Sequence, residues 1–120
     1  MIGAVLLGAA LPAAAEGLVG SWSGGGSVQL PSGDMERARC KATFHRAGGK
    51  SYSMNAVCAS SSARVAQTAS LQQVSANRFA GDFTNSEYNV SGTISITLSG
   101  DSLSAHLDGG GASAHFNLSR

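Results

Sequence analysis

Three histidines, His45, His106 and His115, offer the most easily recognised chemistry in this sequence. Imidazole binds metal ions and exchanges protons near neutral pH. If residues 110–111 form a turn, His106 and His115 lie opposite each other on neighbouring strands, and Asp108 is the one obvious third ligand. His106 and His115 are therefore a candidate metal pair. The alternative, which we favour, is that they are two solvated surface histidines and that the protein holds no metal.

Catalytic arrangements are harder to find. Serine is abundant, but the G-x-S-x-G pattern of a nucleophilic serine does not occur. In a chain this rich in serine, almost any Ser, His and Asp could be grouped into a triad. The carboxylate pairs flank turns, Asp34 with Glu36 and Asp82 with Glu87. We therefore expect a protein that is not an enzyme and needs no cofactor.

Charge is distributed unevenly, although the formal net charge is only +1. Residues 37–78 carry seven basic side chains and no acidic one, whereas residues 81–108 carry four acidic side chains. Arg37, Arg39 and Lys41 alternate along one face of a predicted strand, and His45 continues the line. These four residues, here called the basic stripe, are a candidate docking surface for an anionic partner. The alternative is that outward strand positions simply carry solubilising charges.

The elements that position these side chains are predicted to be strands, because short segments of alternating apolar and polar residues follow one another from Trp22 onward. At 120 residues the chain has room for one domain. The eight predicted strands cover residues 20–31, 35–47, 51–59, 62–74, 78–84, 87–99, 102–109 and 112–119. Every connection is short and turn-prone, so each strand can pair with its predecessor. We predict an all-β fold, a small eight-stranded antiparallel up-and-down barrel, with a sandwich as the alternative.

Register follows from keeping apolar residues on one face. A loop at residues 48–50 pairs Phe44 with Met54 and brings Cys40 opposite Cys58, both facing inward, which predicts one disulfide. The sixth predicted strand places Tyr88 inward at its start.

One wall of the predicted barrel is thin, because its inward positions include Gly24, Gly26, Ala38, Ala42 and Ala56. That wall either accepts bulky side chains from opposite or leaves a void. An eight-stranded barrel can be filled by side chains or can hold one small ligand.

The N-terminal residues predict export. Residues 2–11 are an uncharged apolar run, followed by Pro12 and three alanines, which is typical of a signal peptide over residues 1–15. The run is much shorter than the roughly 20 residues of a membrane span. We expect residues 16–120 to form a single β-barrel domain in the periplasm or outside the cell, where a disulfide persists.

Two resemblances agree with this interpretation. The Gly20-Ser21-Trp22 segment resembles the Gly-x-Trp motif at the barrel end of calycins, including small metalloprotease inhibitors of the Inh type. Residues 20–28, 36–40 and 58–60 are similar to a group of small secreted alphaproteobacterial β-barrel proteins, of rhizobial type, some of which carry the label SyrB-like regulator. The first resemblance implies a calycin-like barrel with Gly20 and Trp22 at one end, and an inhibitor-like role.

The sequence therefore predicts a non-catalytic binding module of the cell envelope. In the leading hypothesis it docks on a protein, as an inhibitor would, or on an anionic envelope component such as lipopolysaccharide. In the alternative it is a calycin-like carrier of one small apolar ligand. Nucleic acid is not expected as a partner, because no exposed row of aromatic side chains accompanies the basic residues.

Overall fold

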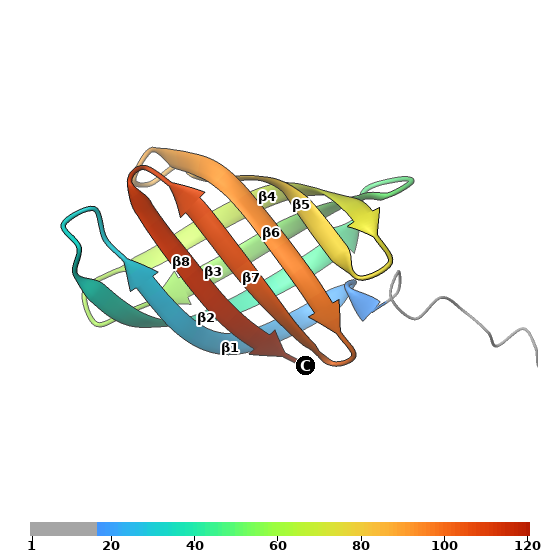
Figure 1. Ribbon diagram of the computed structural model, residues 1–120, viewed down its shortest axis with the longest axis horizontal. Helices are drawn as coiled ribbons and strands as arrows, with labels where there is room; N and C mark the ends of the chain where they lie inside the picture. The colour runs from blue at the N-terminus through green and yellow to red at the C-terminus, as the bar shows by residue number, and fades with distance from the viewer. Residues whose placement is uncertain (1–16) are drawn as a thin grey trace, which may run out of the picture.

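The computed structural model describes residues 17–120, so the predicted signal peptide lies outside the described residues. Eight strands form a closed antiparallel barrel in which each strand pairs with the next and the last pairs with the first (Figure 1). The strands are β1 (Gly20–Gln29), β2 (Met35–Arg46), β3 (Ser51–Ala59), β4 (Arg64–Ser75), β5 (Arg78–Asn85), β6 (Val90–Ser99), β7 (Ser102–Gly109) and β8 (Ala112–Ser119). Within residues 17–120, no helix has the length and apolar character needed to cross a membrane.

The predicted barrel and the predicted disulfide are confirmed, and the strand boundaries differ mainly at β6. This strand begins at Val90 rather than at residue 87, because residues 86–89 form a turn. In that turn Asn89 has a φ of 56°, in the left-handed region that asparagine tolerates. The predicted inward position of Tyr88 is wrong, since its side chain is 56% exposed.

Strand β8 fills part of the space that the small residues of the thin wall leave inside the barrel. A Cβ atom at Gly26 would lie 1.9 Å from the carbonyl oxygen of His115 and 2.7 Å from the Phe116 ring. Only glycine permits this approach of β1 to β8, and the Phe116 ring covers the space that a side chain would fill. The absence of a side chain at Gly26 therefore leaves no gap in this wall.

One half of the barrel, toward the start of β1, is packed with large side chains. The Tyr52 and Phe79 rings meet edge to face, with centroids 5.2 Å apart and an interplanar angle of 89°. The largest fully buried side chains all belong to this half: Leu18, Trp22, Phe44, Tyr52, Leu71, Phe79 and Ile96. Large side chains thus pack this end among the described residues, and we call it the closed end.

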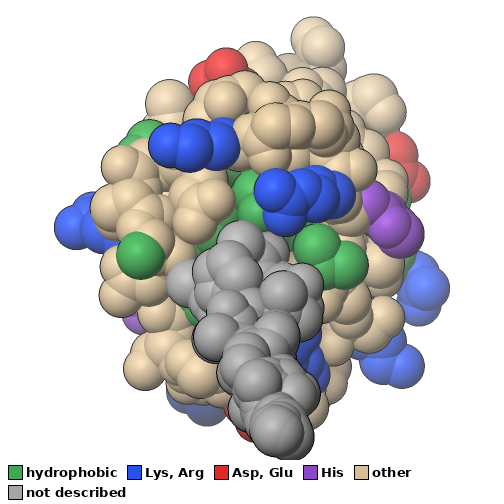
Figure 2. Space-filling view, turned by 90° about the vertical axis from the view of Figure 1, so that its right-hand side faces the viewer, with side chains coloured by type: hydrophobic (Ala, Val, Ile, Leu, Met, Phe, Trp, Pro, Cys, Tyr) green, Lys and Arg blue, Asp and Glu red, His purple; other side chains and the backbone are tan. Residues whose placement is uncertain are grey.

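The segment before β1 covers the closed end. The indole Nε1 of Trp22 donates a hydrogen bond to the Leu18 carbonyl at 3.0 Å, and Leu18 is completely buried. Gly20 and Trp22, the residues that carry the calycin resemblance, therefore lie where the chain enters the barrel. Figure 2 shows this end, with Lys and Arg side chains spaced around it.

Candidate functional site

The other end of the barrel opens into an apolar cavity of about 400 Å³. At this end the last residues of the odd-numbered strands meet the first residues of the even-numbered ones (Figure 1). Residues of both sets line the cavity. Its wall is formed mainly by the inward side chains of Val28, Ala38, Val65, Phe83, Val90, Leu107, Ala114 and Phe116. Ligand pockets commonly have volumes of about 300–1,000 Å³. The open end is thus large enough for one small molecule.

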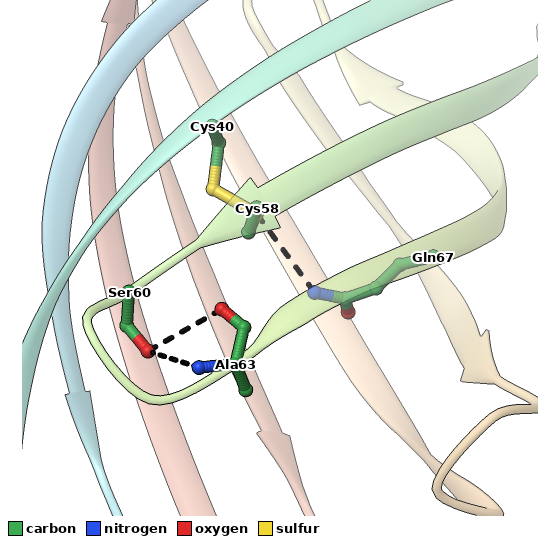
Figure 3. Close-up of a disulfide and its surroundings, with 5 residues drawn as sticks. All are labelled: Cys40, Cys58, Ser60, Ala63 and Gln67. Carbon is green, nitrogen blue, oxygen red and sulfur yellow. Dashed lines mark hydrogen bonds between the residues drawn. A yellow bond between two sulfur atoms is a disulfide. The ribbon is translucent and has the colours of Figure 1, made fainter.

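The Cys40–Cys58 disulfide lies at the inner limit of this cavity. The two residues pair across β2 and β3, with Cα atoms 4.1 Å apart. Cys58 lines the cavity, and both cysteines line a smaller space of about 30 Å³ that also touches Phe44 and Met54. Figure 3 shows the bond bridging the two strands inside the barrel. The disulfide therefore stiffens the part of the wall where side chains are smallest.

Two amide side chains place polar groups in this mainly apolar space. Gln67 donates through Nε2 to the Cys58 Sγ at 4.0 Å (Figure 3). Asn85 is 8% exposed, and its Oδ1 accepts the backbone N–H of Tyr88 at 3.2 Å. Asn85 thus holds the turn that places Tyr88 at the mouth of the cavity.

Among the described residues that line the cavity, Glu36 is the one with a charged side chain. Its side chain is half-buried, and both of its carboxylate oxygens lie 2.9 Å from the Ser62 Oγ, which donates to them. Ser62 belongs to the loop between β3 and β4. A bond from the Ala63 N–H to the Ser60 hydroxyl, at 3.2 Å, ties that loop together (Figure 3).

Our sequence analysis did not identify Glu36, Gln67 and Asn85 as site residues, although strand alternation reveals all three. Each lies two residues from an inward-facing residue of the same strand, and therefore on the same face. Glu36 is two residues from Ala38 on β2, Gln67 from Val65 on β4, and Asn85 from Phe83 on β5. A polar residue at an inward position is the signal that could have found them.

The basic stripe lies on the outer face of β2, on the opposite side of the wall from the cavity. All four of its side chains, Arg37, Arg39, Lys41 and His45, are exposed. Between residues 17 and 120, none of them forms an ion pair. The stripe therefore leaves its charges available to a partner in solution.

His106 and His115 are paired across β7 and β8, with ring centroids 6.3 Å apart. His106 Nε2 lies 2.9 Å from Asp108 Oδ2, and both side chains are about half exposed. In the described part of the chain, no group of three or more His, Cys, Asp or Glu residues has the arrangement of a metal site. His45 lies on β2, away from this pair.

No protein-family model matches the chain, and a search of curated proteins finds no match. Solved structures do match. The redesigned β-barrel mFAP1 bound to DFHBI superposes with a TM-score of 0.75 at 16% sequence identity, over 89% of this chain and 98% of that one. The resemblance is one of fold.

Two further solved structures extend the comparison. A de novo designed fluorescence-activating β-barrel has a TM-score of 0.68 at 15% identity, covering 92% of this chain and 98% of its own. Rv2717c from M. tuberculosis has a TM-score of 0.51 at 16% identity, again over 92% and 98% of the two chains. This chain thus shares its barrel architecture with these proteins, at a level of sequence identity that shows only the fold.

Proposed function

We propose that this protein binds one small, largely apolar molecule in the open end of its barrel and catalyses no reaction on it. The observation that carries this proposal is the apolar cavity of about 400 Å³, open at one end and closed beneath by the disulfide and the packed half. The solved structure of mFAP1 with DFHBI shows that a barrel of this architecture can hold a small molecule.

An apolar cavity of this size favours a ligand on physical grounds. Protein interiors are close-packed, with few voids larger than a water molecule. Water in an apolar cavity has few hydrogen-bond partners, so its replacement by an apolar molecule is favourable. The closed half shows that this sequence can fill a barrel completely where Trp22, Tyr52 and Phe79 lie. The open half is lined instead by short side chains such as Ala38, Val65 and Ala114.

The compartment is part of the proposal. The apolar run of residues 2–11, followed by alanines at 13–15, supports export to the periplasm or the medium. The disulfide Cys40–Cys58 supports the same compartment, because such bonds persist in oxidising surroundings. A binding protein in that location would meet its ligand outside the cytoplasm.

The test begins with the full chain expressed for export in a bacterial host and examined by native mass spectrometry. Extra mass that disappears on denaturation would identify a co-purified ligand. In parallel, the unliganded protein is titrated with the neutral fluorescent dye Nile red. We expect saturable binding with a stoichiometry of one. The proposal is overturned if the native spectrum shows no extra mass and Nile red also fails to bind saturably.

Two substitutions test whether the dye binds inside the cavity or on the outer surface. Ala38→Phe places a ring inside the cavity and should abolish Nile red binding. Ala66→Phe makes the same change on the exposed outer face of β4 and should leave binding intact. If Ala38→Phe does not fold, Val65→Trp fills the same cavity from another strand. Equal dye binding by the inner and outer variants would place the dye on the surface instead.

The basic stripe supports a second candidate function, docking on an anionic partner. Its exposed and unpaired charges on β2 are the observation that favours it. The triple charge reversal of Arg37, Arg39 and Lys41 to Glu should then abolish binding to lipopolysaccharide vesicles while leaving Nile red binding unchanged. Unchanged vesicle binding would reject docking through this surface.

A further inference from the structure

The cavity has a chemical preference that follows from the charge at its mouth. We infer that the ligand is a cation with an apolar body, an amine or a quaternary ammonium compound, whose charged group binds Glu36. This inference rests on the proposed function, because it requires that a molecule enter the cavity. It adds the charge of the ligand and the residue that recognises it.

The first step is the position of Glu36. It comes directly before Ala38 in the inward-facing series of β2, and among the described residues it is the single charged residue of the cavity lining. A carboxylate at this position is partly removed from water, since its side chain is half-buried. Charge–charge attraction is stronger at such a site than on an exposed surface, because the apolar wall lowers the local dielectric constant.

The second step is that the Glu36 carboxylate has unused capacity to accept hydrogen bonds. A carboxylate can accept about four hydrogen bonds. Here the Ser62 hydroxyl provides one donor, placed between the two oxygens at 2.9 Å from each. Within the described residues, no Lys, Arg or His forms an ion pair with Glu36. The carboxylate is therefore oriented by Ser62 and retains acceptor capacity for a cationic donor.

The third step is the charge of the loops around the opening. The loops and strand ends at the mouth carry the acidic residues Asp34, Glu36, Glu87 and Asp108. Asp34, Glu87 and Asp108 are exposed, as are the basic residues Arg37, Arg39 and Arg64 near this end, and Asp108 lies 2.9 Å from His106. Of the four acids, Glu36 is the one that lines the cavity, so a ligand inside the cavity meets a negative charge, which attracts ligands of the opposite sign.

The closed end is basic. Among the described residues, its strand ends and loops carry Arg46, Lys50, Arg78 and Arg120, with Asp101 as the acid among them. Figure 2 shows this end of the barrel. A cation therefore meets positive charge at the closed end and the negative charge of Glu36 in the cavity.

The fourth step is the aromatic residue at the mouth. Tyr88 lines the cavity and is 56% exposed, so one part of its ring is available to a ligand. Aromatic faces attract ammonium groups as well as apolar surface. Tyr88 therefore suits a ligand that has both, whereas it contributes little to recognition of an anion.

Three compounds that differ only in their charged group test this inference. Octylamine is a cation at neutral pH, octan-1-ol is neutral and octanoate is an anion, and each is titrated against Nile red bound to the full chain. We expect octylamine to displace the dye at a concentration about tenfold lower than octan-1-ol, with octanoate weakest, because hydrogen bonds to charged groups are the stronger ones. Equal displacement by all three would overturn the inference.

Matched variants test whether the preference for octylamine comes from Glu36. Glu36→Gln keeps the shape and an oxygen for the contact with Ser62 but removes the charge, and it should remove the advantage of octylamine over octan-1-ol. Glu87→Gln makes the same change on an exposed acid of the same end and should have little effect, because exposed charges are screened by salt. Equal losses in both variants would contradict a direct contact with Glu36.

The outcomes separate the inference from the proposed function. Saturable Nile red binding without selectivity for octylamine would overturn the cationic ligand and leave the apolar cavity site standing. Absence of binding by the dye and by all three compounds would overturn both. If Glu36→Gln does not fold, the order of the three compounds on the unmodified protein decides.

Discussion

The guanidinium of Arg120 lies over the Trp22 ring, with its central carbon 4.5 Å from the ring centroid. The same side chain donates through Nη1 to the Val19 carbonyl at 3.0 Å and through Nε to Asp101 Oδ1 at 3.3 Å. One arginine thus joins the segment before β1, the first strand and the turn between β6 and β7. This arrangement holds together the closed end of the barrel.

Replacement of Arg120 by Ala should therefore lower the free energy of unfolding by about 1–2 kcal/mol, from the lost cation–π contact and hydrogen bonds. The measurement is urea unfolding at neutral pH. Arg78→Ala is the control, because Arg78 is exposed at the same end and forms no ion pair with any other described residue. A loss of the same size in both variants would show that general charge, and not the Trp22 contact, is responsible.

The glycine at position 26 gives a second prediction. Gly26→Ala places a Cβ atom 1.9 Å from the His115 carbonyl oxygen, so β1 and β8 must separate. We expect a loss of about 2–3 kcal/mol in the free energy of unfolding, typical of overpacking. Gly25→Ala is the matched control, since its closest contact would be 3.2 Å, to the Ala38 carbonyl oxygen. Unfolding by urea should show Gly26→Ala to be clearly less stable than Gly25→Ala, and equal stabilities would refute the close approach.

The disulfide gives a third prediction. The two cysteines are separated by 18 positions, and closing a loop of that size stabilises a protein by about 3 kcal/mol in the chain-entropy model. The double variant Cys40→Ala, Cys58→Ala should therefore unfold at lower urea concentration than the oxidised protein. The control is the unmodified protein with its disulfide reduced, which should lose a similar amount. If neither loses stability, the barrel is held by its packed half alone.

The strands and their register were predictable, because alternation is a strictly local property of the chain. Pairing Phe44 with Met54 is enough to place Cys40 opposite Cys58, and the structure has this register. Turn-prone residues at each connection then leave little freedom in the order of strands.

The cavity was not predictable to the same degree, because it depends on contacts between distant parts of the chain. Whether the wall at Gly26 is filled depends on Phe116, which reaches it only when β8 closes the barrel. The turn at Tyr88 depends on the hydrogen bond that its N–H donates to the Asn85 side chain, which alternation does not show. The inward position of Glu36 is visible in the sequence, whereas the absence of an ion pair to it among the described residues is not.

Asn85 gives the last prediction, and it links the cavity to the turn at its mouth. Its Oδ1 accepts the Tyr88 N–H at 3.2 Å from a position that is 8% exposed. Asn85→Leu preserves most of the volume but removes the acceptor, which should lower the free energy of unfolding by about 1–2 kcal/mol. It should also release residues 86–89, so that their amide hydrogens exchange faster while those of β2 are unchanged.

The control for this change is Asn55→Leu, which makes the same substitution at an exposed position on β3. It should alter neither the exchange of residues 86–89 nor the binding of Nile red. Because Tyr88 lines the mouth of the cavity, Asn85→Leu should weaken binding of octylamine more than that of octan-1-ol. Unchanged amide exchange at residues 86–89 in Asn85→Leu would mean that other contacts hold the turn, such as the bond from the Ala66 N–H to Glu87 Oε1 at 3.0 Å, and that Tyr88 is positioned without Asn85.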